Sequence, residues 1–441
     1  MNKPISPSGT QTLVICPALR QRMPDPESEA ALATRSPEAR LEEARGLAMA
    51  IALNVVHGEV VHVSHPTPAT LFGKGAMERI AELVREHEAE LVFVDHAVTP
   101  VQQRNLEKAW NTKVIERTGL ILEIFGERAR TGEGKLQVEL AALTYQRSRL
   151  VRSWTHLERQ RGGFGFIGGP GETQLEADRR LIGDQITRIK AELENVIRTR
   201  ELHRQARKRV PYAVVALVGY TNAGKSTLFN RLTKSEVFAK DLLFATLDPT
   251  MREVRLPTGR HIILSDTVGF ISDLPTQLVA AFRATLEEVQ QADVILHVRD
   301  ISHPDTEAQK ADVMAVLADL DIDTGEQGNL IEVSNKMDLM PPEDAQWLAK
   351  ELSESLNRAA VSAITGEGLD LLLRKIESLL SKDMCVAEYS LDISNGAALA
   401  WLYEHAEVLK RKDDEEKVHL KVRISPDNIG RFEGRFLGFD Q

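Results

Sequence analysis

Short apolar runs alternate with amphipathic stretches between residues 41 and 125. EVVHVSH (59–65), LVFVDHA (91–97) and KVIE (113–116) are rich in β-branched residues, which is typical of strands. Between them, GAMERIAELVREHEAE (75–90) and VQQRNLEKAW (101–110) repeat apolar positions at helical spacing. Strands that alternate with helices predict an α/β domain with a parallel sheet, which we place at residues 41–130. The preceding residues 1–40 are rich in Pro, Ser and Ala and predict a flexible N-terminal arm.

A longer helical pattern follows at residues 131–209. Apolar residues recur at intervals of three, four and seven in two blocks: Leu136, Leu140, Leu143, Leu150, Trp154 and Leu157, then Leu175, Ile182, Ile186, Ile189, Leu193 and Val196. Two long helices with a short connection predict an antiparallel two-helix hairpin. Its tip (161–172) holds six glycines between Gly162 and Gly171. Such a tip has many permissive backbone positions, and we expect it to become ordered only on a partner.

Charge is unevenly distributed along the chain. The 441 residues carry a formal net charge of −10, which argues against indiscriminate binding to nucleic acid. From Arg147 to Arg209, however, 15 Arg or Lys stand against 8 Asp or Glu, a local charge of +7. A solvated helical spacer would explain a charge run, but a basic two-helix arm with a glycine-rich tip favours RNA binding.

The overall composition is that of an ordinary globular protein, with 42% hydrophobic and 27% charged residues. Its length suggests about three domains. Neither end resembles a signal peptide, and we expect no stable membrane insertion because no long uninterrupted apolar run occurs. The two cysteines, Cys16 and Cys385, lie far apart and suggest buried thiols in a reducing cytosol. We therefore expect a cytoplasmic protein, with peripheral membrane association left open.

A phosphate-binding motif begins the next block, at 210–382. VVALVGYTNAGKSTLFN (214–230) has a β-branched run, then a loop from Gly219 to Ser226 that matches G-x-x-x-x-G-K-[ST]. The glycines let backbone N–H groups surround a phosphate, and a helix beginning near Lys225 directs its positive end at the anion. Lys225 is expected on the β- and γ-phosphates and Ser226 on Mg²⁺. A chance turn would lack the strand before and the helix after.

Further motifs follow at the spacing of a GTP site. HIILSDTVG (261–269) is a strand that delivers Asp266 to the second shell of the metal and the Gly269 amide to the γ-phosphate. LIEVSNKMDL (330–339) ends in Asn335, Lys336 and Asp338. A carboxylate can accept two N–H bonds from guanine, whereas adenine would leave it unpaired, so the motif favours GTP over ATP.

The remaining site residues complete the expected nucleotide pocket. Ser362 and Ala363 end another strand, where the Ala363 amide could meet the guanine O6. LFATLDPT (243–250) is expected to be the nucleotide-sensing switch, with Thr246 on Mg²⁺ and Thr250 as the alternative. The residues expected at GTP or GDP and Mg²⁺ are Gly219, Tyr220, Thr221, Asn222, Ala223, Gly224, Lys225, Ser226, Thr227, Phe244, Thr246, Asp266, Gly269, Asn335, Lys336, Asp338, Ser362 and Ala363. Those expected to act in catalysis are Lys225, Thr246 and Gly269.

Phe270 occupies the place where many GTPases carry a water-orienting glutamine. Its ring cannot hydrogen-bond a water, so we expect slow hydrolysis by the free chain and completion of the site by a partner. Phe270 could equally pack beneath the switch, and the two interpretations are compatible.

With these residues assembled, the chain resembles the HflX family of ribosome-associated GTPases. The resemblance rests on TLFGKG, EGKLQVELAAL, GGPGETQLEADRR, VALVGYTNAGKSTLFN, LFATLDPT and DTVGFI. It implies binding to the large (50S) ribosomal subunit and its rRNA through the arm and the N-terminal domain. It also implies ribosome-stimulated GTP hydrolysis and the separation of stalled or idle 70S particles under stress. We expect a monomer off the ribosome.

The expected fold class is α/β. A P-loop GTPase domain with a mixed, mostly parallel sheet is joined to the N-terminal α/β domain, the antiparallel arm and a C-terminal α+β module (383–441). In that module CVAEYSLDI (385–393), AALAWLYEHAEVL (397–409) and KVHLKVRIS (417–425) predict strand, helix and strand, with KRKDDEEK as a solvated turn. Two other functions stay open: a partner in RNA modification or processing, for which no second catalytic constellation is present, and a signalling GTPase, for which the basic arm would be unneeded.

Overall fold

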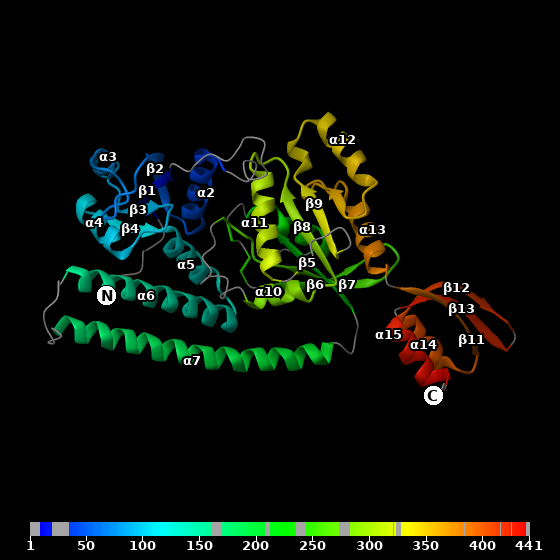
Figure 1. Cartoon of the computed structure of the whole chain (residues 1–441). Helices are drawn as coiled ribbons and strands as arrows, with labels where there is room; N and C mark the ends of the chain where they lie inside the picture. The colour runs from blue at the N-terminus through cyan, green and yellow to red at the C-terminus, as the bar shows by residue number, and fades with distance from the viewer. Residues whose placement is uncertain are drawn as a thin grey trace.

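Three β-sheets organise the described part of the chain, and helices cover them (Figure 1). The structure is a computed structural model that describes residues 9–19, 35–160, 170–207, 212–234, 243–244, 246–247, 249–272, 283–320, 322, 328–382, 384–414, 416–424 and 426–437. The α/β class, with a mixed and mostly parallel central sheet, confirms the fold expected from the sequence.

The N-terminal domain contains a four-stranded sheet in the order β2-β1-β3-β4, with every neighbouring pair parallel. Its strands are β1 (Gln11–Leu19), β2 (Asn54–Val63), β3 (Leu91–Val94) and β4 (Lys113–Glu116). Its helices are α2 (Pro37–Ala50), α3 (Lys74–Glu86), α4 (Pro100–Trp110) and α5 (Arg117–Arg128). The parallel α/β domain predicted from the alternating pattern is therefore present.

The prediction of a flexible arm over residues 1–40 is wrong for residues 11–19. These residues form β1, which lies between β2 and β3, and Leu13, Val14 and Ile15 are fully buried there. Helix α2 also begins at Pro37, with the Ser36 side chain capping it. The local apolar run that forms β1 is short, and the Pro- and Ser-rich composition around it hid the strand signal.

Two long helices form the arm. Helix α6 (Gly132–Gln160) and helix α7 (Pro170–Arg207) lie side by side and run in opposite directions (Figure 1). Ile186, Ile189 and Leu193 of α7 are buried, as are Val138 and Ala141 of α6. The leucines predicted as the seam of α6 are only half-buried where the structure describes them. The predicted glycine-rich tip falls largely on residues 161–169, outside the described residues.

The central domain is built on a six-stranded sheet in the order β10-β9-β8-β5-β7-β6, in which only β6 is antiparallel to its neighbour. Its strands are β5 (Ala213–Gly219), β6 (Thr250–Arg255), β7 (His261–Asp266), β8 (Val294–Asp300), β9 (Leu330–Asn335) and β10 (Arg358–Ala360). Its helices are α8 (Lys225–Thr233), α10 (Arg283–Gln290), α11 (Thr306–Asp319), η2 (Met337–Leu339), α12 (Pro342–Ser353) and α13 (Leu369–Leu380). The carboxyl ends of β5, β8, β9 and β10 meet at one edge of the sheet, where ligands bind in open α/β sheets.

The C-terminal module has a three-stranded antiparallel sheet in the order β11-β13-β12. It consists of β11 (Cys385–Asp392), α14 (Gly396–His405), β12 (Glu407–Asp413), β13 (Lys417–Ile424), α15 (Pro426–Phe432) and the π-helical turn η3 (Glu433–Leu437). The predicted helix over 397–409 is too long, and residues 410–413 of the predicted turn belong to β12. Pairing with β13 draws these residues into the sheet against their local pattern.

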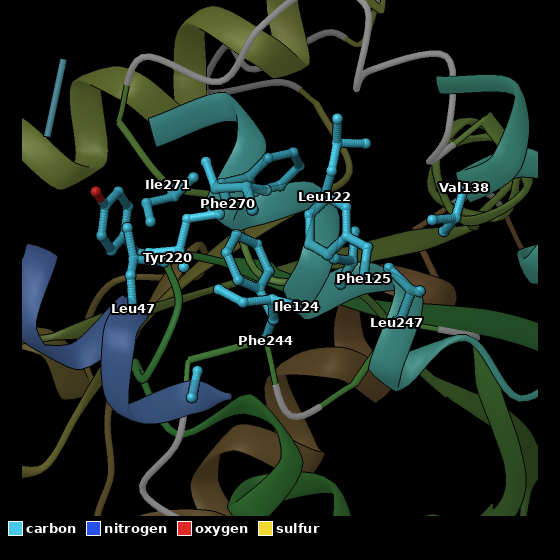
Figure 2. Packing of buried hydrophobic residues seen from close by; sticks show 14 of the residues in the cluster. Leu47, Leu122, Ile124, Phe125, Val138, Tyr220, Phe244, Leu247, Phe270 and Ile271 are labelled. Atoms are coloured by element: carbon cyan, nitrogen blue, oxygen red, sulfur yellow. The ribbon is translucent and has the colours of Figure 1, made fainter. Parts of the chain in front are cut away.

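A single apolar cluster joins the N-terminal and central domains. Leu47 of α2 and Phe125 of α5 share it with Tyr220, Phe244 and Phe270 of the central domain (Figure 2). None of the described helices combines the length and the hydropathy that a membrane span requires.

Candidate functional site

The loop between β5 and α8 brings backbone N–H groups to the carboxyl edge of the sheet. Helix α8 begins at Lys225, as the sequence predicts. Gly224 has a left-handed backbone, and a Cβ atom there would lie 2.2 Å from Nδ2 of Asn335. Only glycine lets the loop turn this close to β9. The loop and the start of α8 therefore form a concave set of amides suited to an anion.

The Lys225 ammonium lies inside this loop. Its Nζ donates to the carbonyl oxygens of Gly219 at 3.0 Å and Tyr220 at 2.8 Å. Burial lowers the pKa of Lys225 to about 8, and the nearby Asp266 carboxylate opposes that shift. A cation in this position can pair with phosphate oxygens that enter the loop.

Three oxygen-bearing side chains converge beside the lysine. The Ser226 hydroxyl donates to Asp266 Oδ2 at 2.7 Å and lies 2.9 Å from the Thr246 hydroxyl. Thr246 also donates to Asp266 Oδ2 at 2.9 Å. Burial raises the pKa of Asp266, and the hydrogen bond from Ser226 opposes that shift. This arrangement brings together the three residues that the sequence assigns to the metal.

The donor set fits a hard divalent cation. The second carboxylate oxygen of Asp266, Oδ1, is buried without a hydrogen-bond partner among the described residues. Two hydroxyls are oxygen ligands of the kind that Mg²⁺ prefers, and the carboxylate behind them places negative charge near the cation. The alternative threonine, Thr250, is the first residue of β6 and pairs in the sheet with Asp266, while Thr246 directs its hydroxyl into the cluster.

The residues predicted to recognise the base meet at the ends of β9 and β10. Asn335 donates through Nδ2 to the Ala223 carbonyl at 2.8 Å and accepts at Oδ1 from the Ala363 amide at 3.0 Å. The Ser362 hydroxyl donates to Asp338 Oδ1 at 2.6 Å, which holds the carboxylate in place. These contacts tie the loop between β5 and α8 to both segments that are predicted to recognise the base.

Lys336 is fixed on the same side of the sheet. Its backbone is left-handed, and its Nζ lies 2.7 Å from Asp300 Oδ2. The ion pair anchors the end of the side chain.

The segment after β7 lies directly against the phosphate loop. The Phe270 amide donates to the Gly219 carbonyl at 3.1 Å, and the Phe270 carbonyl accepts from the Thr221 amide at 2.7 Å. A Cβ atom on Gly269 would lie 2.8 Å from Thr221 Cγ2 and 3.0 Å from Lys225 Nζ. Glycine is therefore required where this backbone passes the loop. In this arrangement the Gly269 backbone lies close to the lysine that would bind a terminal phosphate.

The Phe270 side chain lies in the protein core. It is buried in the cluster shared by the two domains, near Phe244 and Phe125 (Figure 2). Phe125 and Phe244 form an edge-to-face pair with ring centroids 4.8 Å apart. The switch segment that holds Phe244 and Thr246 is thus packed against helix α5 of the N-terminal domain.

A buried polar network crosses the same interface. The Tyr220 hydroxyl donates to Glu43 of α2 and accepts from Arg35 at 2.6 Å and from the Ser272 amide at 2.7 Å. Burial alone would raise the pKa of Glu43, but Arg117 and Arg35 outweigh it and hold that pKa below its ordinary value.

Arg117 at the start of α5 completes this network. Its guanidinium donates to Glu43 at 2.5 Å, to the Ser272 hydroxyl at 2.8 Å and to Asp95. Sequence reasoning missed Arg35, Glu43, Asp95, Arg117 and Ser272, because isolated charged residues in ordinary helices and strand ends have no spacing signal.

Four family models match the chain and together cover most of it. The family models match under the descriptions GTP-binding GTPase N-terminal (residues 38–126), GTP-binding GTPase Middle Region (128–207), 50S ribosome-binding GTPase (214–336) and HflX C-terminal domain (348–440). A GTPase HflX of Magnetococcus marinus is 50% identical over 394 residues, which span 89% of this chain and 90% of that protein.

This chain belongs to the HflX family of GTPases.

A second curated relative agrees with this assignment. The GTPase HflX of Escherichia coli K12 is 45% identical over 81% of this chain and 83% of its own length. Among solved structures, a GTP-binding protein of Sulfolobus solfataricus in complex with GDP is 22% identical, covers 84% of this chain and 99% of its own, and has a TM-score of 0.43. As an HflX GTPase, the chain binds guanine nucleotide and hydrolyses GTP, with Mg²⁺ as the usual metal of such enzymes.

Proposed function

We propose that this chain is a GTPase that binds the large ribosomal subunit and dissociates stalled or idle 70S ribosomes under stress. Its GTP hydrolysis is slow in the free protein and is stimulated by the ribosome. The description of the matched central family as a 50S ribosome-binding GTPase supports the partner. The basic arm at 131–209 and the N-terminal domain are the surfaces that meet the subunit and its rRNA.

Each site residue has a role in this proposal. The loop amides from Thr221 to Thr227 and the Lys225 ammonium hold the phosphates, while Asp338, Asn335 and the Ala363 amide select guanine. Ser226 and Thr246 hold Mg²⁺, with Asp266 supporting it from the second shell. Bound Mg²⁺ would neutralise charge on the phosphate oxygens.

The position of Phe270 is the observation that supports slow GTP hydrolysis by the free chain. Its side chain offers no hydrogen bond to a water, and it is buried in the core shared by two domains. The Phe270 backbone is held against the phosphate loop by two hydrogen bonds, one to the Gly219 carbonyl and one from the Thr221 amide. Rearrangement of this segment therefore involves the N-terminal domain, which is one of the proposed ribosome-binding surfaces. A ribosomal subunit that displaces the N-terminal domain would therefore change the geometry of the nucleotide site.

Dissociation of purified 70S ribosomes tests the proposal. The protein with GTP should shift sedimentation from 70S to free subunits, and GTP turnover should rise when large subunits are added. Lys225→Ala should abolish both effects, because it removes the cation of the phosphate loop. Equal turnover with and without large subunits would contradict the stimulation.

Deletion of the tip, residues 161–172, separates the proposal from its rivals. The deletion variant should still bind GTP but no longer dissociate ribosomes. A variant that dissociates ribosomes as well as the full chain would contradict the role of the arm, whereas loss of GTP binding would show that the deletion damages the fold.

A further inference from the structure

Helix α12 lies at the outer edge of the central domain, away from the N-terminal domain (Figure 1). It packs beside β10, the edge strand of the sheet. Its buried face consists of Ala345, Leu348 and Leu352, and the opposite face of the helix is open to solvent. None of the nucleotide-site residues lies on this helix.

A tryptophan lies in the middle of the open face. The Trp347 side chain is 66% exposed, which is unusual for so large an apolar group. Leu356, just beyond the end of the helix, is 70% exposed. Single exposed apolar residues are common on protein surfaces, so the indole alone does not mark a binding site. The charged side chains around Trp347 distinguish this surface from a single exposed apolar residue.

Carboxylates surround the tryptophan at helical spacing. Glu343 and Glu351 lie four residues before and after Trp347, and Asp344 lies three before it, so all three share its face of the helix. Lys350, three residues after Trp347, is an exposed cation on the same face. Glu354 follows at the cap. All four carboxylates are exposed, and none forms an ion pair within the part of the chain that the structure describes. Lys350 offsets part of this charge, and the face keeps a net negative charge from four carboxylates that form no ion pair among the described residues.

The stability of helix α12 accounts for only two of these four carboxylates. Glu343 and Asp344 are in the first turn, where negative charge favours the positive end of the helix dipole. Glu351 and Glu354 are at the other end, where a carboxylate opposes the dipole by a few tenths of a kcal/mol. Their position is better explained by a partner that supplies the missing positive charge.

We propose that the outer face of α12, formed by Glu343, Asp344, Trp347 and Glu351, binds a basic polypeptide segment. An arginine or lysine side chain of that segment stacks on the Trp347 indole, which attracts cations over its face. The surrounding carboxylates accept the hydrogen bonds of the same cation, and an arginine can do so in bidentate fashion. An RNA strand is a poor fit, because its phosphates would be repelled by these carboxylates. The surface is independent of the nucleotide site and of the basic arm.

Binding of a short fluorescein-labelled polyarginine peptide to the full-length protein, followed by fluorescence anisotropy, tests this proposal. Trp347→Ala should weaken binding by about tenfold, and Trp347→Phe, which keeps an aromatic face, should weaken it much less. The triple variant Glu343→Gln/Asp344→Asn/Glu351→Gln should weaken it at least as much as Trp347→Ala and reduce its salt dependence.

A matched control separates this face from the net negative charge of the whole chain. The triple variant Glu78→Gln/Glu82→Gln/Glu86→Gln removes the same charge from exposed positions of α3 and should leave the affinity nearly unchanged. GTP binding by every variant reports that the fold is intact. The proposal is overturned if both triple variants lose affinity equally, if Trp347→Ala has no effect, or if a single-stranded RNA probe binds this face instead.

Discussion

The Tyr220 hydroxyl donates a hydrogen bond to the Glu43 carboxylate and thereby joins the phosphate loop to helix α2 of the N-terminal domain. The same hydroxyl accepts from the Ser272 amide, just after the segment that lies on the phosphate loop. One side-chain oxygen thus contacts the loop that would hold phosphate, the segment that would sense it and the neighbouring domain.

Tyr220→Phe should destabilise the protein by about 1–3 kcal/mol, because it leaves the buried Ser272 amide without its acceptor and removes the bond to Glu43. Chemical denaturation of the nucleotide-free protein measures the loss. Tyr212→Phe is the matched control, since Tyr212 is 45% exposed and its hydroxyl forms no hydrogen bond with the residues that the structure describes. Equal stability of the two variants would show that the network contributes nothing.

The interaction energy of the edge-to-face pair of Phe125 and Phe244, which spans the domain interface, should be measurable. Each single change to Leu removes the ring pair, and the double variant should be less destabilised than the sum of the two. The coupling expected for such an aromatic pair is about 0.5–1.5 kcal/mol. A double-mutant cycle on the free energy of unfolding gives this value, and strict additivity would mean that the two rings do not interact in solution.

Asp338→Asn should weaken GTP binding by about 1.5–3 kcal/mol, since an amide cannot accept both N–H bonds of guanine through ionised oxygens. Its NH₂ group can instead donate to the O2 of xanthine. The variant should therefore bind xanthosine triphosphate better than the parent protein does. Competition of each nucleotide against a fluorescent GDP analogue measures this change in nucleotide preference. An unchanged preference for guanine would place base recognition elsewhere.

Buried His297 should make the central domain sensitive to mild acid. Burial lowers the pKa of His297 to about 3 in the folded protein, although the nearby Glu332 opposes the shift. The unfolded chain protonates this group near its ordinary value of 6.5, so unfolding takes up a proton between these two values. Stability is therefore complete above about pH 6.5 and falls as the pH drops, by up to about 1.4 kcal/mol per pH unit.

His297→Gln should flatten this dependence between pH 6.5 and 5, whatever its effect on stability at neutral pH. His303→Gln is the comparison, because His303 lies in the loop after β8 and is not buried. The free energy of unfolding is measured for each protein as a function of pH. If it changes equally with pH in the parent and in His297→Gln, another group controls the loss of stability in acid.

The local sequence pattern determined most of the secondary structure of this protein and the position of its phosphate loop. The spacing of Gly219, Gly224, Lys225 and Ser226 is enough to predict a phosphate loop, because consecutive amides and the start of the next helix do the binding. Alternating strands and helices predicted the parallel sheets, because the side-chain periods of 2 and 3.6 residues are written directly into the sequence. Strand-end motifs at 266 and 335–338 then fell at one edge of the sheet, as parallel topology requires.

Tertiary structure decided how these parts are connected. Residues 11–19 became a central strand only because β2 and β3 flank them, and the burial of Phe270 depends on helices α2 and α5 from another domain. Glu43, Arg117, Tyr220 and Ser272 are far apart in the chain and meet only when two domains pack together. No spacing rule relates such residues, because burial of their shared apolar surface, rather than backbone geometry, brings their polar groups within hydrogen-bond distance.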